Sequence, residues 1–150
     1  LISNRRGFTE LAKHSLNVCR RKGLSASILL FDLNKFKPIN DKFGHAEGDR
    51  ALIVFANILR KVFRESDVFG RLGGDEFAVL MMDVDAENTQ RVIQRFNNEV
   101  TTYNQEAARG YDIEYSVGFV NSLIENNIDV NDLLAAADKE MYAEKGNKVR

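Results

Sequence analysis

The sequence predicts an α+β fold in which helices surround a mainly antiparallel sheet. This prediction rests on three observations. Apolar residues recur at helical spacing in several segments, and short apolar runs typical of strands lie between them. A Gly-Gly pair at residues 73–74 joins two of these runs in the manner of a hairpin. The resulting order is helix, strand, two helices, two strands, helix, strand and helix, which favours helices packed on a sheet.

The first helix is expected to run from a cap at residue 3 or 4 to about residue 21. Ser3 or Asn4 can cap its start, because either side chain accepts hydrogen bonds from free backbone N–H groups, and Gly23 ends it after about Arg21. Its apolar face is expected to carry Phe8, Leu11, Ser15 and Val18. The next run, SASILLFDL over residues 25–33, is apolar enough for a strand buried on both faces.

A short helix and a longer one follow this strand. The short helix spans residues 35–43, where Pro38 is tolerated because it lies in the first turn. Residues 47–63 carry apolar side chains at helical spacing and predict the longer helix. Residues 67–72 and 76–82 then predict two strands around the Gly-Gly pair.

The last part of the chain adds a long helix, a strand and a final helix. The long helix is expected over residues 86–108, and the alternating IEYSVGFV over 113–120 predicts the strand. Asp129 or Asn131 can cap the final helix, which is expected to reach about Lys145. The sequence contains no internal repeat or low-complexity tract, so we interpret the chain as one domain.

The composition is that of a globular domain without a strong charge preference. Hydrophobic residues make up 44% and charged residues 29% of the 150 residues, and the formal net charge is −1. This charge disfavours binding to a nucleic-acid polymer, so an anionic ligand has to meet a local basic cluster. The single cysteine, Cys19, excludes an internal disulfide and suits a reducing cytosol. No apolar run approaches membrane-spanning length.

Two aspartates stand at the ends of apolar runs. Asp32 ends ILLFD, and Asp75 follows the Gly-Gly pair in RLGGDEFAVL, which is expected to place it at the exposed tip of a hairpin. If their strands are neighbours, the two carboxylates meet at one edge of the sheet, where they repel each other unless a cation neutralises them. Mg²⁺ prefers oxygen ligands of this kind. The alternative is that Asp75 and Glu76 are solvated turn residues without a role, which is the favoured interpretation for an isolated GGDE sequence.

The stretch NKFKPINDKFGHAEGD, which follows the first strand, contains residues suited to a nucleotide. Lys35 and Lys37 lie at the start of the short helix, where free backbone N–H groups favour phosphates. The amide of Asn40 and the carboxylate of Asp49 have the hydrogen-bonding groups needed to recognise a purine edge. Taken singly, each residue is a common cap or turn residue. Together with a metal pair, they predict a pocket for a nucleoside triphosphate.

These motifs resemble the GGDEF family of diguanylate cyclases. GGDEF stands at residues 73–77, FDLNKFKPINDKFGHAEGD resembles the second signature of the family, and RESD at 64–67 resembles its inhibitory product-binding motif. NRRGF near the start and ADKEMYAEK near the end resemble the flanking signatures. The resemblance covers residues 1–150 as a single domain. It implies a central antiparallel sheet of about five strands, similar to the nucleotidyl cyclase and polymerase-palm (ferredoxin-like) fold.

The resemblance also implies roles for individual residues. Asp32, the carbonyl of Leu33 and Asp75 would bind Mg²⁺ or Mn²⁺. The GTP-binding residues would be Phe36, Asn40, His45, Asp49 and Lys145, with Asn40 and Asp49 recognising guanine and Lys145 holding the terminal phosphates. Lys37 would stabilise charge on the phosphates, and Glu76 or Asp75 would help to activate the 3′-hydroxyl. Arg64 and Asp67 would bind the inhibitory product, although the two residues could instead form only a local ion pair.

The implied reaction condenses two GTP into cyclic di-GMP with release of pyrophosphate, by attack of one 3′-hydroxyl on the α-phosphate of the other GTP. Because one pocket holds one GTP, turnover requires a two-fold homodimer. The family implies second-messenger signalling by a cytoplasmic domain of a bacterial protein, joined to an N-terminal sensor or a membrane anchor. The alternative is an inactive domain that binds GTP or cyclic di-GMP as a regulator.

Three positions depart from the family pattern. The opening signature is truncated at Leu1, which leads us to expect a piece of a longer protein. Val149 stands where an arginine usually follows Lys145 by four residues, and this weakens the expected hold on the terminal phosphates. Glu114 stands where threonine is common, and the sequence gives no functional account of it.

Overall fold

The computed structural model describes residues 3–124 and 129–149, with side chains described within 4–124 and 129–145. In this part of the chain five strands form one sheet, in the order β1-β3-β4-β2-β5. The strands are β1 (Ser3–Asn4), β2 (Ser25–Asn34), β3 (Val68–Gly73), β4 (Glu76–Met82) and β5 (Glu114–Leu123). β1 runs parallel to β3, whereas β3–β4, β4–β2 and β2–β5 are antiparallel. The predicted α+β fold with a mainly antiparallel sheet is therefore confirmed.

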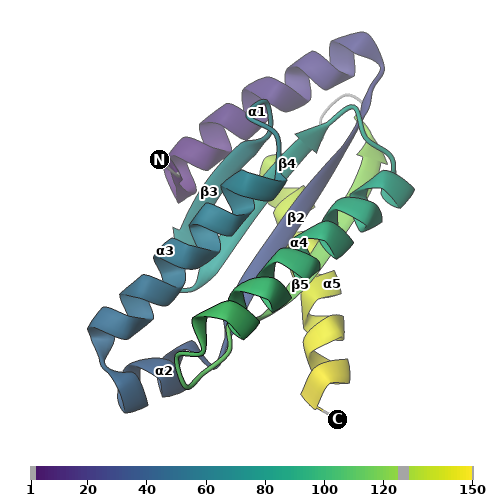
Figure 1. The fold of residues 1–150 in the computed structure, drawn as a ribbon. Coiled ribbons are helices and arrows are strands. Elements are labelled where there is room, and N and C mark those ends of the chain that lie inside the picture. Colours follow the sequence, from purple (N-terminus) through teal and green to yellow (C-terminus); the bar gives the residue numbers. More distant parts are fainter. Residues whose placement is uncertain (1–2, 125–128, 150) are drawn as a thin grey trace.

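Five helices in the described part of the chain accompany the sheet (Figure 1). α1 (Arg5–Lys22) and α5 (Val130–Val149) pack on one face, and α3 (His45–Val62) and α4 (Ala86–Ala107) pack on the other. The short α2 (Phe36–Phe43) lies at one end of the molecule, beside the start of α3. Within residues 3–124 and 129–149, no helix combines the length and apolar character needed to cross a membrane.

The two faces of the sheet bury different cores. On the α3/α4 face, the ring of Phe31 lies between 5.1 and 6.2 Å, centre to centre, from the rings of Phe55, Phe63, Phe96 and Tyr115. On the opposite face, Ile28 and Leu30 are buried with apolar side chains of α1 and α5. Because successive side chains of a strand alternate between the faces, β2 has to be apolar along most of its length. The predicted strand buried on both faces is confirmed.

The start of the chain differs in part from the prediction. Asn4 caps α1 as expected, since its side chain accepts a hydrogen bond from the N–H of Gly7 at 2.9 Å. Leu11, however, is 52% exposed rather than buried. The buried stripe of α1 runs through Phe8, Ala12, Ser15, Leu16 and Cys19, and Leu11 lies outside it. β1 was not predicted, because a strand of two residues carries no periodic pattern.

Candidate active site

Acidic side chains meet where β2 ends and β4 begins. Asp32 of β2 lies directly opposite Glu76 of β4 in the antiparallel register. Paired residues in such strands point to the same face of the sheet, which here is the face covered by α1 and α5. The N–H of Leu33 donates to the carbonyl oxygen of Asp75 at 3.0 Å and fixes the hairpin turn against β2. The structure thus brings Asp32 and Asp75 together, as the sequence predicted.

The turn that carries Asp75 is formed by two glycines and held by an arginine. Gly73 and Gly74 have φ values of 155° and 48°, in the region that favours glycine. Arg71 donates to the carbonyl oxygen of Gly74 from Nε at 2.9 Å and from Nη2 at 2.6 Å. Asp75 was expected at an exposed tip, but it is half-buried because the turn packs against the end of β2.

Crowding of the carboxylates changes their proton affinities. Burial, followed by the charge of Asp32 and a side-chain hydrogen bond with it, raises the pKa of Asp75. Burial, followed by the charges of Asp32, Asp138 and Asp75, raises the pKa of Glu76. Lys145 of α5 supplies a positive charge through an ion pair between its Nζ and Oδ2 of Asp32. Burial, the largest single influence, lowers the pKa of Lys145, but its hydrogen bond to Asp32 and the charges of both aspartates together raise it.

The carboxylates fit a divalent cation that binds together with a nucleotide. Oδ1 of Asp32 is buried and has no hydrogen-bond partner among the described residues. A buried carboxylate oxygen of this kind is costly unless a cation or a ligand contacts it. Among these same residues, no group of three or more His, Cys, Asp or Glu side chains is arranged to hold a metal alone. Mg²⁺ commonly takes one or two carboxylates and completes its shell with substrate phosphates and water.

The α2–α3 corner holds the residues predicted to recognise a base. Oδ1 of Asn40 is buried without a hydrogen-bond partner in the described part of the chain. It packs so closely against Gly48 that a Cβ on that glycine would lie 1.7 Å away. His45 and Asp49 are exposed in the first turns of α3. Asn40 therefore presents an unsatisfied acceptor beside two exposed polar side chains, which suits a ligand with N–H donors.

The loop from β2 to α2 is Lys35 alone, and Lys37 lies in the first turn of α2; both lysines are held in ion pairs. Lys35 has a left-handed backbone with φ 59°, and its Nζ lies 2.8 Å from Oε2 of Glu114. Lys37 is highly exposed and pairs with Asp41 at 3.2 Å. Phe36 is half-buried and packs against the aromatic core of the α3/α4 face. Glu114, for which the sequence suggested no role, thus anchors the strained residue of this loop.

Arg64 and Asp67 lie on the turn after α3, remote in the fold from the hairpin turn. The backbone N–H of Arg64 donates to Oδ2 of Asp67 at 2.8 Å, and Nη2 of Arg64 lies 3.1 Å from Oδ1. The side chain of Asp67 is 1% exposed and that of Arg64 is 53% exposed. Burial raises the pKa of Asp67, and the contacts with Arg64 oppose that rise. Nearby, Arg95 donates to the carbonyl oxygen of Val62 at 2.7 Å.

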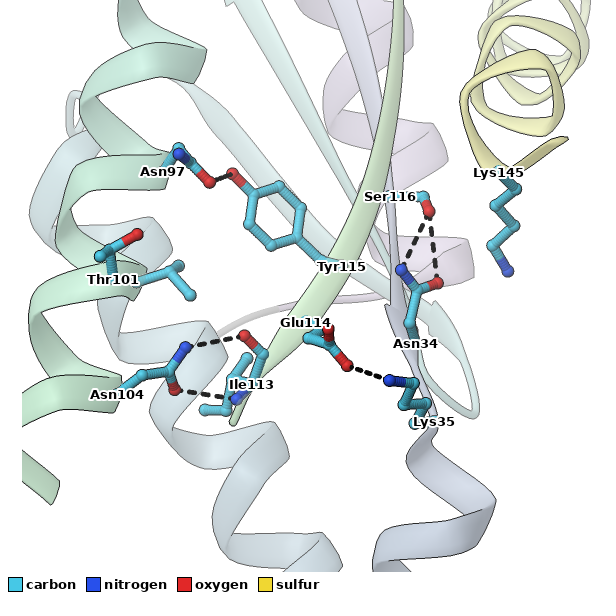
Figure 2. A pocket seen from close by; sticks show the side chains of 11 residues that line it. Asn34, Lys35, Asn97, Thr101, Asn104, Ile113, Glu114, Tyr115, Ser116 and Lys145 are labelled. Atoms are coloured by element: carbon cyan, nitrogen blue, oxygen red, sulfur yellow. Dashed lines mark hydrogen bonds and ion pairs between the residues drawn. The ribbon is translucent and has the colours of Figure 1, made fainter. Parts of the chain in front are cut away.

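A pocket of about 630 Å³ lies between α4, the start of β5 and Lys145 (Figure 2). Asn34 and Ser116, which line the pocket, exchange hydrogen bonds of 3.1 and 3.2 Å. Lys145 reaches toward this pair from α5 and connects the pocket with the acid cluster. Sequence reasoning missed Asn34 and Ser116. The signal that could have found them is the pairing of β2 with β5, which places Ser116 opposite Asp32.

Comparisons with known proteins show which proteins the chain is similar to. A family model described as "Diguanylate cyclase, GGDEF domain" matches residues 1–150. The probable diguanylate cyclase DgcC of Escherichia coli (strain K12) is 33% identical over 144 residues, which are 96% of this chain. The chain spans only 38% of the length of that relative.

Solved structures of other proteins share the fold. The GGDEF domain of TpbB (YfiN) from Pseudomonas aeruginosa is 28% identical with a TM-score of 0.86, and the match covers 97% of this chain and 86% of that one. A structure described as a novel interaction mode between a microbial GGDEF domain and cyclic di-GMP is also 28% identical, with a TM-score of 0.79. That match covers 96% of this chain and 88% of the other.

Proposed function

Because the chain belongs to the GGDEF-domain family of diguanylate cyclases, we propose that it condenses two GTP into cyclic di-GMP and two pyrophosphates. The observation that carries the proposal is the convergence of Asp32 and Asp75 beside Lys145, at the end of β2, where the chain continues into the basic start of α2. Without a ligand, clustered carboxylates with raised pKa values are unfavourable, and such clusters are characteristic of functional sites.

Asp32, Asp75 and the carbonyl oxygen of Leu33 would hold Mg²⁺, or Mn²⁺ in its place. A divalent cation bound there supplies charge neutralisation for the phosphates and increases the acidity of an attacking hydroxyl. The chain itself supplies two negative charges and a buried oxygen that lacks a partner in the described structure. Lys145 compensates that charge in the structure, and we assign it the terminal phosphates when a nucleotide binds.

Removal of the 3′-hydroxyl proton is assigned to an acid of the cluster, and stabilisation of charge on the phosphates to Lys37. Glu76 lies opposite Asp32, and its raised pKa makes it a stronger base than an ordinary carboxylate. We assign it the proton of the 3′-hydroxyl, with Asp75 as the alternative acceptor. Lys37 is paired with Asp41 only at the surface, so it is free to contribute positive charge to the phosphates during the reaction.

Guanine recognition is assigned to the α2–α3 corner. Asn40 and Asp49 would pair with the base edge, with His45 and Phe36 near the nucleotide. The buried oxygen of Asn40 and the exposed carboxylate of Asp49 support this assignment, since guanine presents adjacent N–H donors. A site that leaves buried polar groups unpaired with the wrong base discriminates strongly against it.

Turnover requires two copies of the chain. Each acid cluster and α2–α3 corner accommodates one GTP, so the 3′-hydroxyl of one nucleotide reaches the α-phosphate of the other only across a two-fold homodimer. Holding both nucleotides in line supplies much of the rate acceleration. The greater length of the curated relative supports a regulatory or sensor domain outside this chain that controls such pairing.

Product feedback is assigned to Arg64 and Asp67. In the structure they form the local ion pair that was the alternative interpretation. The half-exposed guanidinium of Arg64 can still bind a phosphate or guanine through its remaining donors. Asp67 would take part only if the ion pair opens, because its side chain is buried and both its oxygens are occupied.

A regulatory module that binds GTP or cyclic di-GMP without turnover is the second candidate. It is favoured by the ion pair between Lys145 and Asp32, which already neutralises the proposed cation site. The two functions are separated by incubating the chain, fused to a dimeric coiled coil, with GTP and Mg²⁺ or Mn²⁺ and analysing the products by chromatography. Formation of cyclic di-GMP is the expected result. Nucleotide binding without any product would instead establish the regulatory function.

A further inference from the structure

A cluster outside the acid site connects the α4–β5 loop with the first turn of α3. The hydroxyl of Tyr111 donates to Oε1 of Glu47 at 2.8 Å, and Nη1 of Arg109 donates to the same oxygen at 3.2 Å. We call these three side chains the Tyr111 clamp. Tyr111 and Glu47 are 64 residues apart in the sequence, so their contact is a tertiary one.

The clamp has an apolar part that reaches α2. The ring of Tyr111 lies 5.1 Å, centre to centre, from the ring of Phe43, the last residue of α2. Gly110 has φ 89°, and a Cβ on it would lie 3.4 Å from the Phe43 ring. Figure 1 shows the loop that leaves α4 running beside α2 at this end of the molecule. The loop therefore contacts α2 and α3 together.

The loop that carries the clamp is itself fixed to the body of the domain. The side chain of Asn104, on α4, donates to the carbonyl oxygen of Ile113 at 3.0 Å and accepts from its N–H at 2.8 Å (Figure 2). Ile113 is buried directly before β5. The clamp thus connects the α2–α3 corner to a segment anchored on both α4 and the sheet.

The position of Glu47 makes this contact relevant to the nucleotide. Glu47 and Asp49 are two residues apart on α3, about 200° around the helix axis. Glu47 consequently faces the clamp, while Asp49 is exposed on the other side. Gly48, between them, contacts the amide of Asn40. A movement of this turn would therefore displace Asn40 and Asp49 together.

The charge states favour a strong contact at neutral pH. The hydrogen bond from Tyr111, followed by smaller influences that include the charge of Arg109, lowers the pKa of Glu47. Burial, followed by the contact with Glu47, raises the pKa of Tyr111 to about 12. The phenol is thus protonated while the carboxylate is charged. Hydrogen bonds to a charged acceptor are roughly twice as strong as neutral ones.

We propose that Glu47, Tyr111 and Arg109 are positioning residues for base selection, which hold the first turn of α3 so that Asn40 and Asp49 meet guanine in the correct geometry. This inference rests on the proposed function, because it assumes that the α2–α3 corner binds the base of GTP. The hydrogen bonds and ion pairs of the clamp in the described part of the chain join the α4–β5 loop to the first turns of α3, so the clamp acts on base affinity rather than on the chemical step.

The test uses Tyr111→Phe, which removes the hydroxyl and keeps the ring contact with Phe43. Tyr115→Phe is the matched control, because it removes a tyrosine hydroxyl that donates to Asn97 of α4 at 3.1 Å. Dissociation constants are measured by calorimetry for 3′-deoxy-GTP and 3′-deoxy-ATP, which lack the attacking hydroxyl. Thermal unfolding verifies that each variant is folded, and Glu47→Gln serves as a second variant that weakens the same contact.

We expect Tyr111→Phe to weaken 3′-deoxy-GTP binding by roughly fivefold, the loss of one modest hydrogen bond, and to leave 3′-deoxy-ATP binding unchanged. In the dimerised enzyme, KM for GTP should rise while kcat stays the same. Equal effects of Tyr111→Phe and Tyr115→Phe, or unchanged selectivity in both Tyr111→Phe and Glu47→Gln, would overturn the inference and leave the proposed function intact. If the parent chain shows no preference for the guanine nucleotide, the proposed function fails, and the inference fails with it.

Discussion

A methyl group at position 48 would collide with the side chain proposed to recognise guanine. The Cβ of an alanine there would lie 1.7 Å from Oδ1 and 2.8 Å from Cγ of Asn40. The Asn40 amide therefore has to move by about 1.7 Å to reach the 3.4 Å of ordinary contact. Functional hydrogen bonds tolerate displacements of only about 0.5 Å. Gly48→Ala should consequently remove the contacts of Asn40 with the base.

The expected loss of binding is large compared with the effect on the fold. Losing one or two hydrogen bonds in a desolvated site costs about 1–3 kcal/mol, which is roughly 5- to 150-fold in the dissociation constant. Alanine is favoured over glycine in a helix by about 0.5–1 kcal/mol. Oδ1 of Asn40 has no hydrogen bond to lose within the described structure. The variant should be as stable as the parent or slightly more so, with a melting temperature higher by up to about 4 °C.

Calorimetric titration with 3′-deoxy-GTP, combined with thermal unfolding of the same samples, measures both effects. Asn40→Ala should weaken binding to a similar degree, and the double variant should lose little more, because both changes remove one interaction. Gly48→Ala with the affinity of the parent would refute the reasoning. So would a loss of binding explained by a melting temperature well below that of the parent.

The remaining predictions concern the acid cluster, the product site and α5. The raised pKa of Asp75 means that the folded chain binds the proton of Asp75 more tightly than the unfolded chain does, so this contribution to stability is present in acid and is lost as pH rises through the raised pKa. Asp75→Asn should therefore abolish turnover and increase the free energy of unfolding at pH 7.5 by roughly 0.5–2 kcal/mol, which thermal unfolding measures. A variant less stable than the parent would contradict this. Arg64→Ala should abolish inhibition by added cyclic di-GMP without changing the initial rate, and a large fall in initial rate would exclude the assignment. Urea unfolding should show a free energy of unfolding lower by about 1–3 kcal/mol, because the buried carboxylate of Asp67 loses a partner. In Gly118→Ala the new Cβ would lie 2.2 Å from the backbone nitrogen of Met141, so displacement of α5 should destabilise the chain by about 1–3 kcal/mol, and an unchanged melting temperature would show that α5 moves freely.

The sequence predicts the acid cluster because its signals are local. Gly73 and Gly74 indicate the hairpin, and Asp32 and Asp75 each stand at the end of an apolar run. Once β2 and β4 pair, the register brings these residues together without further information. The position of Asp75 was predicted less well, because its burial depends on how the turn packs on β2.

The contacts that tune the candidate site could not be predicted from the sequence. The ion pair of Lys145 with Asp32 spans 113 residues, and the hydrogen bond of Tyr111 to Glu47 spans 64. A charged or aromatic residue read alone is compatible with any surface position, so its partner becomes known only when the helices are placed on the sheet. Resemblance to the family suggested a phosphate contact for Lys145, but it gave no indication of the pairing of Lys145 with Asp32.

Glu114 illustrates the same limit. Its departure from the family pattern was visible in the sequence, but its meaning was not. The structure pairs it with Lys35, whose backbone has the left-handed conformation that bulky residues rarely adopt. The pairing follows from the antiparallel register of β2 and β5, which places Glu114 opposite Asn34, the residue before Lys35.

The account depends on Asp32 and Asp75 binding divalent cations together with a triphosphate. The most direct test is the affinity of the parent chain for Mn²⁺, measured by electron paramagnetic resonance titration with and without 3′-deoxy-GTP. We predict tight Mn²⁺ binding that requires the nucleotide and is weakened at least about tenfold in folded Asp75→Asn, as expected when a charged ligand is removed. Equal Mn²⁺ affinity in the parent and the variant would contradict the account.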